Sequence, residues 1–139
     1  MIDDELTQAI IGAAYAVHKK LGNGFLEKVY ENALTVELKR RGFHVRQQAP
    51  ITVYYEGETV GEFFADLLVE DRVIVELKAV NSILKEHEVQ LVNYLNATGI
   101  ETGLLLNFSS SVQVRRKSRD YKPTLKINPV NPENLVNPV

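Results

Sequence analysis

Two carboxylates and one lysine lie in apolar segments, where charged side chains are rarely left unpaired. Asp66 interrupts the apolar segment 63–69, and Glu76 and Lys78 stand two residues apart in the segment 72–80. Residues two apart in a strand share a face, so Glu76 and Lys78 project together. Buried charges cost free energy unless they pair with each other, a metal ion or a ligand. If these three side chains meet at one sheet edge, they suit a metal-dependent site that acts on phosphodiesters.

The composition restricts which metal such a site could hold. The 139-residue chain has no cysteine, which excludes disulfides and thiolate metal sites. Carboxylate and carbonyl oxygens favour Mg²⁺ or Mn²⁺. The lack of cysteine also fits a reducing cytoplasm, and no apolar stretch approaches the roughly 20 residues that span a bilayer. We therefore expect a cytoplasmic protein with no membrane partner.

The charge of the chain argues both for and against a nucleic-acid partner. The net charge of −2 is unusual for such a protein, which normally carries an excess of basic residues. Basic residues are nevertheless concentrated in segments 39–46 and 115–119. Each cluster is either a solvated surface or a local patch that contacts phosphates, and the sequence leaves both interpretations open.

Hydrophobic periodicity predicts the elements that must position the charged residues. It predicts helices over about 3–21, 25–41 and 84–98, and strands over 45–55, 59–69, 73–80, 101–108 and 112–116. The two strands that carry the charges are apolar on both faces, so both faces need covering. We expect an α/β fold in which helices flank a central mixed sheet of four to five strands.

Proline divides the chain into two parts. Pro50 lies within the first predicted strand and favours an edge position for it. The other four of the five prolines follow residue 120. We expect one folded domain over residues 1–120 and an Asn/Pro-rich tail over 121–139 that is extended or flexible.

The loop between the second and third predicted strands decides whether the carboxylates meet. A three-residue loop, 70–72, sets Asp66 directly opposite Glu76 on one face. A tight two-residue turn would set Asp66 opposite Val75 and separate the carboxylates onto two faces. Two facing carboxylates repel each other, and a divalent metal ion would neutralise them. The site hypothesis therefore requires the three-residue loop or a bulge.

Three further polar residues are candidates from their helical spacing. Glu27 lies one turn before Tyr30, although a glutamate in a first turn more often responds to the helix dipole. Gln90 and Tyr94 share a stripe with His87, and a polar stripe is normally the solvent face. From spacing alone, each residue is either functional or simply solvated.

These motifs resemble the PD-(D/E)XK nuclease superfamily. Asp66, a gap of nine residues and then Glu76-x-Lys78 match its core signature, with Ala65 in place of the proline. The five residues from 90 to 94 are similar to the QxxxY motif of RecB-type members.

A further motif lies at the start of the second helix. Residues 24–30 spell GxxExxY, and residues 5–119 are similar to the GxxExxY family of PD-(D/E)XK proteins. The resemblance implies a restriction-endonuclease-like core.

The resemblance also implies a metal centre. Asp66 and Glu76 would bind Mg²⁺, or Mn²⁺, and the Leu77 carbonyl would be a further ligand. Glu27 would complete the carboxylate set through a second metal ion or a water ligand.

The remaining motif residues would act on the substrate. Lys78 would orient or help deprotonate the attacking water and stabilise charge on the phosphate. Gln90 and Tyr94 would position the backbone or brace the site. The implied activity is in-line hydrolysis of DNA by a metal-activated water, as in an endonuclease, with RNA not excluded as substrate.

Two other functions compete with catalysis. The chain could be a nucleic-acid-binding or protein-interaction module on a nuclease fold without turnover, or Glu76 and Lys78 could form a structural salt bridge. Within the nuclease hypothesis, an enzyme similar to archaeal Holliday-junction resolvases would need a homodimer, so that two sites cut symmetrically.

Overall fold

The computed structural model describes residues 3–119. The elements are α1 (Asp3–Leu21), α2 (Glu27–Arg40), β1 (Val45–Tyr55), β2 (Glu58–Val69), β3 (Val73–Lys78), α3 (Lys85–Thr98), β4 (Thr102–Phe108) and β5 (Val112–Ser118). Their order is the predicted one, and β3 ends at Lys78 rather than at residue 80. The predicted tail, 121–139, lies outside the described residues. No helix in the described part of the chain is both long and apolar enough to cross a membrane.

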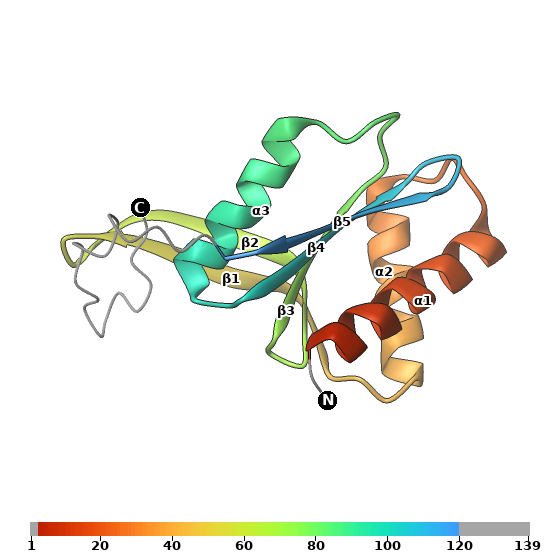
Figure 1. Cartoon of the computed structure of the whole chain (residues 1–139), viewed down its shortest axis with the longest axis horizontal. Coiled ribbons are helices and arrows are strands. Elements are labelled where there is room, and N and C mark those ends of the chain that lie inside the picture. The colour runs from red at the N-terminus through yellow and green to blue at the C-terminus, as the bar shows by residue number, and fades with distance from the viewer. Residues whose placement is uncertain (1–2, 120–139) are drawn as a thin grey trace.

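The strands form one mixed sheet in the order β1-β2-β3-β4-β5. Three neighbouring pairs are antiparallel, and β3 and β4 are parallel. The parallel pair needs a crossover connection, which α3 provides. Helices α1 and α2 lie on one face of the sheet and α3 lies on the other (Figure 1). The predicted α/β fold with a central mixed sheet is confirmed, and β1, which contains Pro50, is an edge strand as expected.

Strand β3 is covered on both faces, as its apolar sequence predicts. Val75 and Leu77 pack in the cluster that α1 and α2 share with the sheet. Ile74 packs against Leu91 and Leu95 of α3 in the second cluster. Burying one such aliphatic side chain stabilises the fold by about 1.5–3 kcal/mol. The two layers therefore fix β3 and the charged side chains that it carries.

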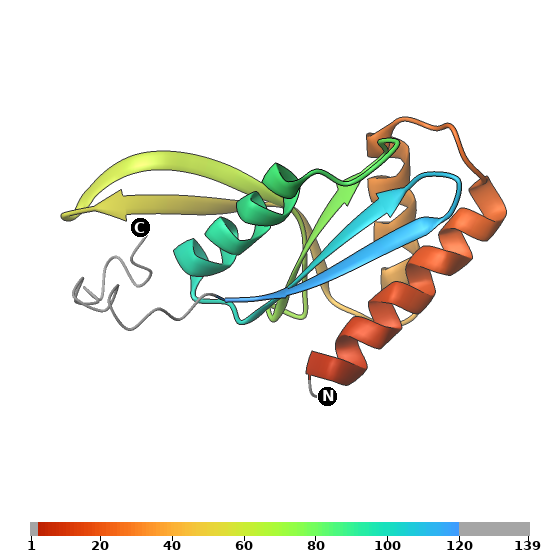
Figure 2. The ribbon, with the colours of Figure 1, turned by 45° about the horizontal axis from the view of Figure 1, so that its top comes forward.

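The β1–β2 hairpin twists away from the rest of the sheet. It extends beyond the other strands and lies alongside α3 (Figure 2). Leu67 packs under α1 and α2, whereas Ala65, two residues earlier on the same strand, packs under α3. Gln48 lies across from this point with a φ of 51°, in the left-handed region. The hairpin thus leaves the sheet at Asp66, the residue between Ala65 and Leu67.

The turn between β2 and β3 has the predicted three-residue length. Leu68 pairs with Ile74, a register that sets Asp66 opposite Glu76. Glu70 and Asp71 both have a positive φ, of 54° and 53°. The Glu70 side chain accepts a hydrogen bond of 2.6 Å from the main-chain N–H of His44 in the connection before β1. The structural condition that the two carboxylates share a face is therefore confirmed.

Candidate active site

Asp66 and Glu76 meet at a fork, the point where β2 and β3 separate. The regular ladder between these strands ends at the pair Leu67–Val75. Beyond it, the Leu77 N–H donates a hydrogen bond of 2.9 Å to Oδ2 of Asp66. The Asp66 N–H donates one of 2.8 Å to Oε2 of Glu76. Each carboxylate is thus held by a main-chain amide of the opposite strand, and the two lie side by side at the fork.

The fork is an unfavourable place for two negative charges. Burial raises the pKa of Glu76 to about 8, and the neighbouring charge of Asp66 adds to the shift. Burial also raises the pKa of Asp66, while its hydrogen bond from Leu77 opposes the rise. The positive charge of Lys78 lowers the pKa of both groups without cancelling the shift. A cation bound between the carboxylates would relieve both the desolvation and the repulsion.

The donor set suits a hard divalent cation. The two facing groups offer only oxygen ligands, which Mg²⁺ and Mn²⁺ prefer. Within residues 3–119, no group of three Asp, Glu, His or Cys side chains is arranged to hold an ion. A cation at the fork would then rely on Asp66, Glu76, main-chain oxygen and water, and Mg²⁺ usually keeps several water ligands. The residues fit such an ion.

Lys78 and Glu27 lie within electrostatic reach of the fork. The charge of Lys78 lowers the pKa of all three carboxyl groups, those of Glu27, Asp66 and Glu76. Glu27, in the first turn of α2, has a raised pKa, chiefly through burial, with Lys78 opposing the shift and Asp66 adding to it. The structure therefore brings together four of the predicted site residues from α2, β2 and β3.

Tyr30 holds the loop that leads to Glu27. Its side chain is fully buried, and its ring stacks on Phe108 at a centroid distance of 4.6 Å. The hydroxyl donates a hydrogen bond of 2.5 Å to the Gly22 carbonyl and accepts one of 3.2 Å from the Phe25 N–H. Tyr30 therefore fixes the backbone before α2 and, through it, the position of Glu27.

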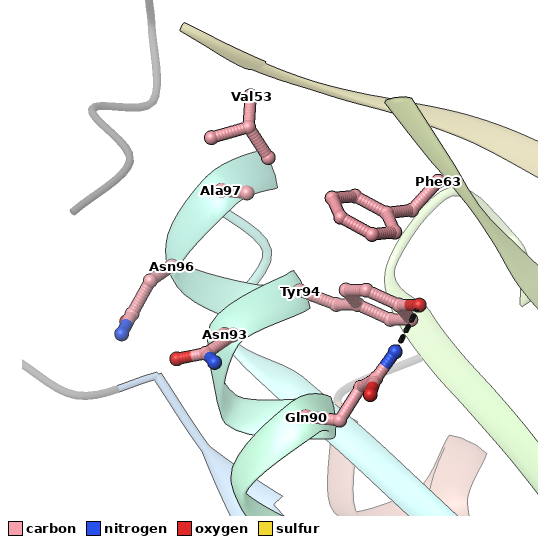
Figure 3. A pocket seen from close by; sticks show the side chains of 7 residues that line it. All are labelled: Val53, Phe63, Gln90, Asn93, Tyr94, Asn96 and Ala97. Carbon is pink, nitrogen blue, oxygen red and sulfur yellow. Dashed lines mark hydrogen bonds between the residues drawn. The ribbon is translucent and has the colours of Figure 1, made fainter. Parts of the chain in front are cut away.

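Gln90 and Tyr94 are hydrogen-bonded to each other on α3, and Tyr94 lies within electrostatic reach of the carboxylates. The Gln90 side-chain amide donates a hydrogen bond of 2.5 Å to the Tyr94 hydroxyl (Figure 3). Burial raises the pKa of Tyr94, Gln90 opposes the rise, and the charges of Glu76 and Asp66 add to it. Tyr94 is 8% exposed, so this stripe is not simply a solvent face. His87 has a local role, because its Nδ1 accepts a hydrogen bond of 3.0 Å from the Leu84 N–H at the helix start.

Glu31 is a buried carboxylate behind Asp66 that the sequence analysis did not identify. It is 3% exposed. It accepts hydrogen bonds from Lys28 (3.0 Å), Gln47 (2.7 Å) and Gln48 (3.1 and 3.2 Å). The Gln48 amide also donates to Oδ1 of Asp66 at 3.3 Å, which links Glu31 to the fork. Its position four residues after Glu27, on the same helix stripe, could have marked it as a candidate site residue, although not as a buried one.

Asn107 anchors the chain that follows Lys78. It is fully buried in β4, opposite Lys78 in the parallel pair. Its side chain accepts a hydrogen bond from the Val80 N–H and donates to the Val80 carbonyl, both at 2.9 Å. The polar interruption of an otherwise apolar strand could have identified it.

The basic cluster at 115–119 is engaged in ion pairs. Lys117 and Arg115 contact Glu88 of α3 at 2.5 and 3.9 Å, and Arg116 contacts Asp4 of α1 at 2.6 Å. These pairs join β5 to helices on both faces of the sheet. For this cluster, the geometry favours a structural role over a phosphate-binding patch.

The fold and the fork together define an α/β protein of the restriction-endonuclease-like class. The model of the PD-(D/E)XK nuclease superfamily matches residues 4–119, and the chain belongs to this superfamily. No curated protein matches the chain.

Solved structures share this fold. The crystal structure of SSO0001 is similar to 71% of this chain with 18% identity and a TM-score of 0.56. The chain spans about half of that protein, 53% of its length. An alkaline exonuclease (LHK-Exo) from Laribacter hongkongensis is similar to 83% of this chain, with 70% of its own length covered, 16% identity and a TM-score of 0.52.

Proposed function

We propose that this chain is a Mg²⁺-dependent nuclease of the GxxExxY type that hydrolyses phosphodiester bonds within DNA. One observation carries the proposal: Asp66 and Glu76 face each other at the β2–β3 fork, and Lys78 acts electrostatically on both. Membership of the PD-(D/E)XK superfamily supports the reaction class.

Each residue has a distinct part in the proposed reaction. Asp66 and Glu76 would hold the cation, with the Leu77 carbonyl, and Glu27 would complete the carboxylate set through a second metal ion or a water ligand. When bound, the cation supplies Lewis-acid stabilisation at the scissile phosphate. The Lys78 ammonium would orient the attacking water and stabilise negative charge that develops on the phosphate oxygens. The water gives up one proton to solvent as its oxygen bonds to phosphorus, the bond from phosphorus to the leaving sugar oxygen breaks, and that oxygen takes a proton from solvent.

The alternative is a nucleic-acid-binding module without turnover. One observation favours it: both carboxylates already accept main-chain hydrogen bonds, as purely structural groups would. Each carboxylate oxygen retains a further lone pair, however, so these bonds are compatible with cation binding.

A substrate panel tests the proposal. The purified protein is incubated with supercoiled, linear, single-stranded and four-way-junction DNA and with single-stranded RNA, in Mg²⁺, Mn²⁺ or EDTA. We expect cleavage of at least one DNA in either metal and none in EDTA. Cleavage that persists in EDTA would contradict the metal-dependent mechanism, and binding without cleavage on every substrate would favour the alternative.

A further inference from the structure

A cavity between the β1–β2 hairpin and α3 opens beside the fork. It has a volume of about 250 Å³ and is lined by Val53, Phe63, Gln90, Asn93, Tyr94, Asn96 and Ala97. Figure 3 shows Val53 and Phe63 of the hairpin opposite the α3 residues. Tyr94 connects the cavity with the fork, because its side chain lines the cavity and the charges of Glu76 and Asp66 raise its pKa. Phe63 also precedes Asp66 by only three residues on β2, about 10 Å of strand, so a group next to a substrate phosphate at the fork lies within reach of the cavity.

The lining suits a neutral planar group with polar edges. Phe63, Val53 and Ala97 supply apolar surface, and the Gln90 amide beside the Tyr94 hydroxyl supplies a further hydrogen-bond donor and an acceptor. No side chain with a formal charge is among the described residues that line the cavity, so it does not suit a phosphate. A nucleobase has this chemistry: apolar faces, with donors and acceptors on the edge.

Phe63 is placed to be a stacking surface. Phe63 is 43% exposed, and its ring packs on the buried Tyr94 ring at a centroid distance of 5.8 Å. The ring lies back over Gly61, where an added methyl group would come within 2.9 Å of it. The glycine leaves the ring room to lie against the strand, and the exposed part of Phe63 is open to a ligand.

We propose that this cavity binds one unpaired nucleobase of the substrate strand, stacked on Phe63, next to the phosphate held at the fork. The inference rests on the proposed function and sharpens it. A base inside a duplex cannot enter the cavity, so the preferred substrate is single-stranded DNA or a locally unpaired segment. Base–aromatic stacking accepts any base, so the cavity confers a preference for unpaired strand rather than for sequence.

Tryptophan fluorescence reports directly on the stacking. The chain has no tryptophan, so F63W introduces a single indole at the cavity. Phe64 is the matched control, because it is the next residue on β2, is 54% exposed and points to the other face. Binding of a single-stranded oligonucleotide in EDTA should quench the indole of F63W and leave that of F64W unchanged. Equal quenching of both, or quenching of neither while the oligonucleotide binds, would overturn the inference.

Affinity measurements extend the test to the wild-type ring. Fluorescence anisotropy in EDTA should show that F63A binds single-stranded DNA about tenfold more weakly than wild type, whereas F64A binds it as wild type does. F63W should retain the affinity, and a melting curve shows whether each variant is folded. One abasic position in the oligonucleotide should weaken binding to wild type but not to F63A.

The outcomes separate this inference from the proposed function. If wild type cleaves DNA but F63A and F64A bind single strands equally well, the base cavity is wrong and the nuclease stands. If F63A weakens binding to duplex as much as to single strands, the ring is a general contact and the inference also fails. If wild type neither binds nor cleaves any nucleic acid, both are wrong.

Discussion

Replacing Lys78 by methionine should slow DNA cleavage by about 10²–10³-fold without weakening the binding of divalent cations. The side chain supplies positive charge at the facing carboxylates, and it lowers the pKa of Glu27, Asp66 and Glu76 alike. Removing it takes away stabilisation of negative charge on the phosphate. It also removes a charge that repels a cation, so the affinity for Mn²⁺ should be unchanged or higher.

Single-turnover cleavage in saturating Mg²⁺ and calorimetric titration with Mn²⁺ measure the two effects of K78M separately. Lys39→Met is the matched control, because Lys39 is exposed in the last turn of α2, at the end opposite Glu27. The control should cleave as wild type does. Full cleavage activity in K78M would exclude Lys78 from the chemistry, and equal losses in both variants would point to a general effect of charge.

Glu76→Gln should stabilise the metal-free protein at high pH. The pKa of Glu76 rises from an ordinary value of 4.5 to about 8 in the folded chain. Below pH 4.5 the folded and unfolded chains both keep the proton, so this group does not disfavour folding. Between pH 4.5 and about pH 8, only the folded chain keeps the proton on Glu76. The free energy of unfolding therefore falls as the pH rises through this range, and it levels off above about pH 8. Glutamine never ionises, and its carbonyl can still accept the hydrogen bond from Asp66.

Denaturant unfolding in EDTA measures this effect. We expect E76Q to exceed wild type by about 2–4 kcal/mol at pH 8.5 and by almost nothing at pH 4.5. Added Mn²⁺ should stabilise wild type, increasingly so as the pH rises, and should not stabilise E76Q. Glu62→Gln, at an exposed position on β2, is the control. It should change neither the pH dependence of the free energy of unfolding nor the stabilisation by Mn²⁺. A pH-independent difference between E76Q and wild type would show that Glu76 is not held in a desolvated, repulsive site.

Strand parity predicted what the fork requires, but not which turn forms. Asp66 and Glu76 share a face only with a three-residue turn, and the Leu68–Ile74 pairing has this register. Apolar sequence on both faces of β3 likewise predicted a covering layer on each side. These features depend on local alternation, which a single sequence displays directly.

The twist of the hairpin and the burial of Glu31 could not be predicted in the same way. Strand alternation predicts that Ala65 and Leu67 lie on the same face of the sheet. The strand twists between them, however, and the two side chains pack in different hydrophobic clusters. The burial of Glu31 depends on amides of Gln47 and Gln48, which follow it by 16 and 17 residues. The cavity at Phe63 likewise needs the twisted hairpin to lie against α3. Such features arise from tertiary contacts that no local pattern encodes.

Cleavage by Asp66→Asn tests the central claim most directly. Asparagine keeps the size of the side chain and a carbonyl that can accept the Leu77 hydrogen bond, but it removes the charge that would hold the cation. Asp71→Asn, on the exposed turn of the same hairpin, is the matched control. With one labelled DNA substrate in Mg²⁺, we expect wild type and D71N to cleave at equal rates and D66N to be slower by about 10²-fold or more. Cleavage by D66N at the wild-type rate would show that the β2–β3 fork is not the site of the reaction.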